Sequence, residues 1–237
     1  STPETVEATE VFYTVAGDET LTGVSWDPTT NKMTDNGDGS YTKVFTDVSA
    51  GNHGFKITTG AWGEGKEYVN PLYSDPNNKN FYVQVDADNS KVEIIFNVKK
   101  GCTTEVKVND VTVVEPLPTK EVTLHYLNSN SWESVNLHCW NESGNITGAW
   151  PGLAMTKGEG KWYDTTLWVT TSTTLIFNGT GGQTENISFT PGEKSEWWYA
   201  NGVLSDTKPA EEPIYVVAGD EELTGAKWDC TDLKNEM

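Results

Sequence analysis

Short runs in which β-branched and aromatic residues alternate with polar ones recur along this chain. A period of two is typical of β-strands, and the Gly, Asn, Asp and Pro clusters between the runs predict turns. The strands predicted in the first part are Val11–Val15, Tyr41–Val48, Gly54–Thr58, Asn80–Val85, Lys91–Val98 and Thr104–Val114. Those predicted in the second part are Glu121–Leu127, Ser134–Asn141, Lys161–Val169, Thr173–Phe177 and Glu185–Phe189, with turns at Asn178-Gly179 and Gly181-Gly182.

The spacing of these strands predicts an all-β protein with two tandem immunoglobulin-like β-sandwiches, or related barrels. Two Pro-bearing stretches, 115–119 and 205–213, have the composition of semi-extended linkers. They divide the chain into a first module at 1–115, a second at 116–206 and a remainder at 207–237.

An internal repeat defines the remainder. Tyr13–Gly23 recurs as Tyr215–Gly225, and each copy is followed by Trp-Asp, at Trp26 and Trp228. Because a segment this short cannot bury a core alone, we expect 207–237 to be the truncated start of another copy of the first module. The parent protein is then larger and tandem.

Charge narrows the range of partners. The 35 acidic and 16 basic residues give a formal net charge of −19, which repels phosphate backbones and anionic membrane surfaces. No apolar stretch approaches the roughly 20 residues that cross a bilayer. We therefore expect no nucleic-acid partner and no membrane insertion.

Three cysteines are too few for a disulfide framework.

The sequence offers no recognisable catalytic or metal site. His53, His125 and His138 sit in separate predicted strands, and their only short-range ligand partner, Cys139 beside His138, points to the opposite face of its strand. Asp35–Gly39 lacks the ligand positions of a calcium loop and is interpreted as a hairpin turn. The prediction is a non-catalytic chain without metal or organic cofactor, and a small β-sandwich hydrolase is a minor alternative.

The aromatic residues give the main indication of function. Ten Trp and nine Tyr are more than small cores need, so we expect some of these rings to be exposed. Exposed rings bind the apolar faces of pyranose sugars, while sugar hydroxyls hydrogen-bond to polar side chains. Alternation in one predicted strand puts Val135, Leu137 and Cys139 inside and Asn136, His138 and Trp140 outside. The turn at 148–152 can bring Trp150 beside them. This arrangement indicates a sugar-binding platform. The alternative is that these rings pack in the ordinary way. The sugar site would then lie elsewhere, and the next candidates are Trp197, Trp198 and Tyr199, which we expect to be exposed.

A family resemblance supports the platform. The motifs that carry it, in order, are Ser131-Trp132, Leu137-His-Cys-Trp140, Trp150-Pro-Gly-Leu-Ala-Met155, Lys161-Trp-Tyr163, Ile176-Phe-Asn178 and Gly182-Gln-Thr184. Together they resemble carbohydrate-binding module family 26, whose members bind α-glucan. The resemblance implies that His138, Trp140 and Trp150 occupy the aromatic binding positions, with Gln183 and Glu185 as hydrogen-bonding groups.

The first part resembles the X25-type starch-binding modules of bacterial pullulanases and amylases. The matching motifs are Val15-Ala-Gly-Asp18, Gly23 with Trp26-Asp-Pro28, Ala50-Gly51, Phe55-Lys-Ile57 and Ala61-Trp62. This resemblance implies that Trp62 and Tyr68 meet the sugar. It leaves Trp26 open between a buried motif residue and a ligand-binding residue.

The expected function is non-catalytic binding of starch, amylopectin and maltooligosaccharides, which tethers a larger amylolytic or cell-surface protein to its substrate. The arrangement resembles secreted or cell-surface amylolytic proteins of gut Firmicutes, so we expect an extracellular bacterial location and a monomer. The alternative is a surface adhesin that binds host glycan or protein.

Overall fold

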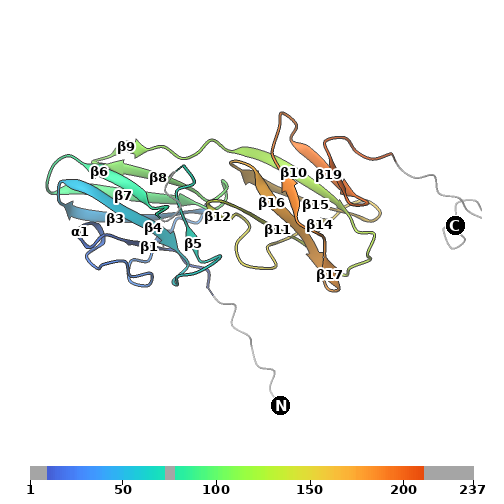
Figure 1. Ribbon diagram of the computed structural model, residues 1–237, viewed down its shortest axis with the longest axis horizontal. Coiled ribbons are helices and arrows are strands. Elements are labelled where there is room, and N and C mark those ends of the chain that lie inside the picture. The colour runs from blue at the N-terminus through green and yellow to red at the C-terminus, as the bar shows by residue number, and fades with distance from the viewer. Residues whose placement is uncertain (1–9, 73–77, 211–237) are drawn as a thin grey trace, which may run out of the picture. The chain divides into compact units, whose positions relative to one another are not determined.

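The computed structural model describes residues 10–72 and 78–210, which form β-strands almost throughout (Figure 1). The all-β prediction is confirmed. The described residues contain one short helix, α1 (Glu19–Thr22), which was not predicted; it ends where Gly23 adopts the left-handed conformation, with φ of 78°. The repeated segment Tyr215–Gly225 and Cys230 lie outside the described residues.

Two sheets pack face to face in the first sandwich. One has the order β1-β4-β5 with β6 also paired to β4, and comprises β1 (Thr14–Gly17), β4 (Gly51–Thr58), β5 (Glu67–Tyr68) and β6 (Phe81–Val85). The other has the order β2-β3-β7-β8-β9 and comprises β2 (Thr34–Asp35), β3 (Ser40–Val48), β7 (Ser90–Asn97), β8 (Thr103–Val108) and β9 (Val111–Val114). Burial alternates strictly along β7, so Val92, Ile94 and Phe96 enter the core between the sheets.

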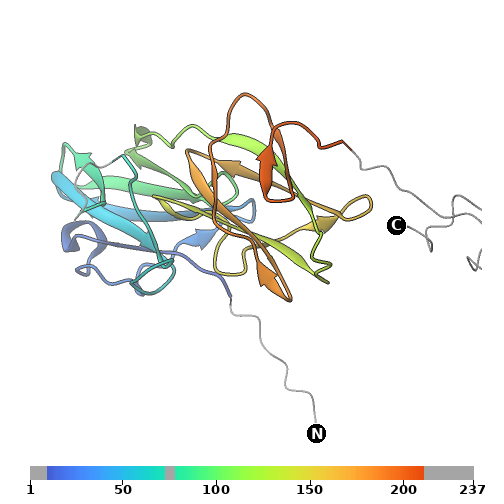
Figure 2. The same cartoon turned by 45° about the vertical axis from the view of Figure 1, so that its right-hand side comes forward.

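The second sandwich also has two sheets. One runs β14-β15-β10-β19-β20 and comprises β10 (Lys120–Leu127), β14 (Thr156–Lys157), β15 (Trp162–Val169), β19 (Glu196–Ala200) and β20 (Val203–Ser205). The other runs β12-β11-β16-β17, with β13 on β11 and β18 on β16; it comprises β11 (Val135–Asn141), β12 (Gly144–Asn145), β13 (Leu153–Ala154), β16 (Thr173–Gly179), β17 (Gly182–Gln183) and β18 (Ile187–Phe189). Figure 2 shows both sandwiches from a second direction.

Most predicted strands agree with the observed ones within a few residues, but several short strands were not predicted, and three larger features differ. The segment 104–114 is a hairpin, β8 and β9, whose turn residues Asn109 and Asp110 both have positive φ. Asn178-Gly179 is no turn, because β16 continues through both residues and the chain reverses at 180–181. The hairpin of β19 and β20, which turns at Asn201-Gly202, was not predicted at all.

The two sandwiches have separate hydrophobic cores but meet at a bonded junction between β5 and β12. The Val69 amide donates to the Ser143 carbonyl at 2.9 Å, and the Tyr68 hydroxyl donates to the Asn145 carbonyl at 2.9 Å. Gly144 fits there because a Cβ at its position would lie 2.8 Å from the Glu67 carbonyl oxygen. Both sandwiches accordingly lie in one compact unit that ends at Thr207.

The buried thiols of Cys102 and Cys139 are both free. Cys102 lies at the junction, where its sulfur is 3.6 Å from the Ile146 carbonyl oxygen. Burial raises the pKa of each thiol to about 12, so both stay protonated and unreactive near neutral pH. In the described part of the chain, no disulfide therefore stabilises either core.

Candidate functional site

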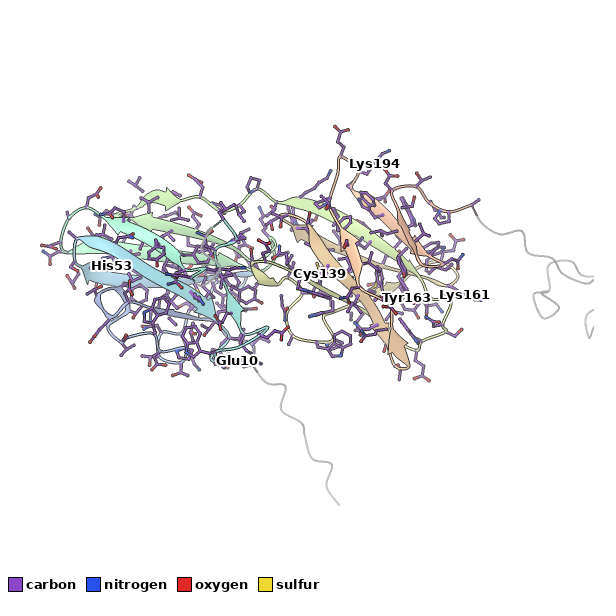
Figure 3. The ribbon with its side chains drawn as sticks, in the orientation of Figure 1. Glu10, His53, Cys139, Lys161, Tyr163 and Lys194 are labelled. Carbon is purple, nitrogen blue, oxygen red and sulfur yellow. The ribbon has the colours of Figure 1, made fainter. Side chains whose placement is uncertain are left out.

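The outer face of β11 carries an aromatic cluster in the second sandwich. Leu137 and Cys139 are fully buried on the inner face. His138 and Trp140 therefore point outward, as strand alternation predicts, and each is only partly buried. Figure 3 labels Cys139 in the middle of this strand.

A tight loop brings Trp150 onto the same face. The Trp150–Pro151 peptide is cis, and Gly152 has φ of 90°. A Cβ on Gly152 would lie 2.1 Å from the Leu137 carbonyl oxygen, so only glycine lets the loop approach β11 this closely. Asn178, a buried residue of β16, donates its side-chain amide to the Pro151 carbonyl at 3.0 Å. The loop is thereby fixed to two strands of the sheet.

The three rings form an angled surface, with His138 between two indoles. Its ring centre lies 5.4 Å from that of Trp140, with 33° between the planes, and 5.4 Å from that of Trp150, with 63° between the planes. Trp150 is 53% exposed and offers the largest open ring. The cluster therefore presents its rings at two different angles and not as one flat plane.

His138 is a neutral ring in this cluster. Its Nδ1 is buried and has no hydrogen-bond partner within the described part of the chain. Burial lowers the pKa of its imidazole below 6.5, which favours the uncharged form at neutral pH. The cluster thus presents apolar surface without a fixed charge of its own.

Gln183 lies on the same face as the cluster. It pairs with Asn178 across β16 and β17, and directly opposite residues share a face of the sheet. Its side chain is exposed. Glu185 is exposed too. Burial raises the pKa of the Tyr199 hydroxyl, and the negative charge of Glu185 raises it further. No described contact joins Glu185 to the three rings.

The first sandwich brings Trp26 and Trp62 together. Their ring centres are 6.5 Å apart and the planes are tilted by 42°. Trp62 is 42% exposed, and the Lys56 ammonium lies 6.0 Å from the centre of its ring. Lys56 also pairs with Glu67 at 2.9 Å, and the Glu67 carboxylate accepts the Gly63 amide at 3.0 Å. These bonds tie the loop that carries Trp62 to the end of the sheet.

The backbone of Trp26 is fixed within the motif that contains it, and whether its ring binds a ligand stays a prediction. It is partly buried, has positive φ of 49°, and donates its amide to the Gly17 carbonyl at 2.8 Å. The next residue, Asp27, accepts bonds from Thr30 and Thr29, which lower the pKa of its carboxyl to about 2. The motif is therefore structurally fixed, while its indole stands beside the exposed Trp62.

Two expectations about aromatic residues were wrong. Tyr68 is only 2% exposed and its hydroxyl is bonded to Asn145, so its ring is closed to a sugar. Trp197 and Tyr199 are not exposed, because they pack against the core of the second sandwich. Trp198 points away from that core and stacks on His125, with ring centres 4.8 Å apart.

Three supporting residues were not singled out from the sequence. Asn178 lies within the motif Ile176-Phe-Asn178, but its assignment to a turn gave no sign of its bond under the Trp150 loop. Lys56 and Glu67 had no signal of their own, although Lys56 lies within the motif Phe55-Lys-Ile57. Side chains that hold a site in place are recognised only when its contacts are seen.

The described residues contain no group of three His, Cys, Asp or Glu side chains placed to hold a metal ion. In the same part of the chain, no helix has the length and hydrophobicity to span a membrane.

The outer face of β11 is an aromatic platform on a β-sandwich, a surface typical of carbohydrate-binding modules. Residues 124–189 match the family model of Starch-binding module 26. This stretch lies within the second sandwich and confirms the family 26 resemblance drawn there. The X25-type resemblance of the first sandwich stays a prediction.

Similar proteins are modules or parts of amylases. An alpha-amylase of Butyrivibrio fibrisolvens is 29% identical over 127 residues, which make up 52% of this chain and 12% of that protein. This chain thus corresponds to a small part of that relative's length.

Two solved structures are also similar. A family 26 module of Eubacterium rectale Amy13K, in complex with maltoheptaose, is 30% identical over 41% of this chain and 49% of its own, with a TM-score of 0.34. A CBM25 module of a Bacillus halodurans amylase is 20% identical over 39% of this chain and 100% of its own, with a TM-score of 0.32.

Proposed function

We propose that this chain binds starch and maltooligosaccharides without cleaving them, through the ring cluster of His138, Trp140 and Trp150. The observation that carries the proposal is the placement of these rings. They stand on the outer face of β11, in the segment that matches a starch-binding family, and the Trp150 ring is open to solvent.

Sugar recognition follows from the chemistry of this surface. The C–H faces of glucose units lie on the indoles and bury apolar area, while Gln183 hydrogen-bonds hydroxyls at the ring edge. Glu185 serves as a further hydrogen-bonding group, farther from the rings. Trp62 and Trp26 provide a second aromatic site on the first sandwich.

In its parent protein the chain holds a larger amylolytic or cell-surface bacterial protein on amylopectin or granular starch, outside the cell. We propose modules 1–115 and 116–206, with 207–237 opening another copy of the first, and a monomer that needs neither metal nor organic cofactor.

Affinity electrophoresis in gels with amylopectin, xylan or mucin tests this function. We expect retardation by amylopectin alone, and Trp150→Ala should remove most of the contribution of the second sandwich. Trp198→Ala is the matched control, because this Trp lies on the outer face of the other sheet of the same sandwich. Retardation by mucin but not by amylopectin would favour a surface adhesin. Release of reducing sugar from soluble starch would mean that the chain is a hydrolase.

A further inference from the structure

The two aromatic clusters lie on either side of the junction between the sandwiches. Asn145 of β12 pairs with Trp140 of β11 in antiparallel register, so both side chains stand on the same face of the sheet. The aromatic platform of the second sandwich therefore has Asn145 as its neighbour on the junction side.

The loop that carries Trp62 touches the same asparagine. A Cβ on Gly65, which follows Trp62 by three residues, would lie 2.9 Å from the Asn145 side-chain nitrogen. Gly65 has φ of 70°, which glycine adopts without strain, and the loop is held from its other side by Glu67. Asn145 thus has Trp140 beside it on one side and the Trp62 loop on the other.

Hydrogen bonds hold these parts in register. Besides the bonds of Val69 and Tyr68 across the junction, the sulfur of Cys102 lies 3.7 Å from the Asn145 carbonyl oxygen. In Figure 1 β5 and β12 lie next to each other at this junction. A site built across it is preorganised, so a ligand that spans it does not have to order a flexible linker.

We propose, on the basis of the starch-binding function above, that both clusters form one continuous site for a single α-glucan chain. The chain runs from Trp62 past Asn145 to Trp140 and Trp150. Asn145 offers an amide to glucose hydroxyls at the centre of this path. The substrate class is an uninterrupted α-1,4-linked run longer than one cluster can hold, as found between the branch points of starch.

Isothermal titration calorimetry with linear maltooligosaccharides of increasing length tests the continuous site. The proteins are the full chain, Trp62→Ala, Trp140→Ala, the double variant and Asn145→Ala. The last keeps the backbone carbonyl that Tyr68 and Cys102 contact, so the junction should stay folded, which its melting temperature checks.

A continuous site predicts one long oligosaccharide per chain, with affinity about tenfold or more above that for maltotetraose. Asn145→Ala should lower affinity for the long ligand by a clearly larger factor than affinity for maltotetraose. The effects of Trp62→Ala and Trp140→Ala should be coupled for the long ligand only.

Two long ligands per chain, with additive effects of the two Trp variants at every length, would overturn the continuous site and leave starch binding intact. Absence of α-glucan binding by the full chain would instead overturn the proposed function itself.

Discussion

The two aromatic clusters of this protein are built on different supports. In the second sandwich His138 and Trp140 project from a central strand, and Trp150 is fixed over them by Gly152 and the buried Asn178. In the first, Trp62 lies in a loop whose fixed points are the partly buried pair of Lys56 and Glu67. A strand defines the direction of its side chains by alternation, whereas a loop depends on a few polar bonds.

This difference has an energetic consequence. A ring held by packed backbone keeps its position when a ligand arrives and loses little conformational entropy. A ring whose loop depends on one partly buried ion pair and one backbone bond is held by fewer contacts, and salt weakens the ion pair. We therefore expect the second cluster to supply most of the affinity for a short oligosaccharide.

The largest effect should come from the inner face of β11. Leu137→Ala removes a fully buried side chain and should lower the free energy of unfolding by about 2–5 kcal/mol. The fraction that stays folded should still bind maltoheptaose normally, since the outer face is unchanged. Thermal melting and calorimetry below the melting temperature measure the two quantities separately; lost affinity in the folded fraction would show that the faces are not independent.

The next effect compares the clusters directly. Trp150→Ala should weaken maltoheptaose binding by about 2 kcal/mol or more, the scale of a central binding residue, with little change in melting temperature because the ring is half exposed. Trp62→Ala should cost about 1 kcal/mol or less. Equal losses measured by calorimetry would contradict the ranking of the second cluster over the first.

The smallest effect depends on pH. Since burial lowers the pKa of His138 below 6.5, the folded state binds fewer protons than the unfolded state. Its contribution to stability is complete above about pH 6.5 and is lost as the pH falls through the lowered pKa. His138→Gln should remove this part of the acid dependence in denaturant titrations between pH 7 and pH 5. An identical pH profile in the variant would show that His138 titrates normally.

The alternation of apolar and polar residues correctly predicted which side chains of a strand point inward and which point outward. It placed Leu137 inside and Trp140 outside, because side chains on successive strand residues point to opposite faces. It failed at 104–114, where the same alternation continues on both sides of a tight turn. The hairpin at Asn201-Gly202 could have been predicted, because Asn-Gly is a strong hairpin signal.

Contacts between distant residues could not be predicted. Tyr68 was expected to face a sugar but is closed off by Asn145, which is 77 positions away in the chain. The segment 115–119 has the composition of a linker, and it does lack regular structure. Nothing in that composition shows that Val69 and Ser143 join the sandwiches directly. Hydrogen bonds between residues this far apart in sequence are known only from the folded structure.

One titration tests the central claim most directly: that the cluster of His138, Trp140 and Trp150 binds α-glucan. The indole N–H signals of the chain, labelled with ¹⁵N at Trp, are followed by NMR while maltoheptaose is added. Saturable shifts of Trp140 and Trp150 are predicted, while Trp132 and Trp197, which pack against the core, stay in place. Binding that leaves Trp140 and Trp150 unmoved would contradict the account.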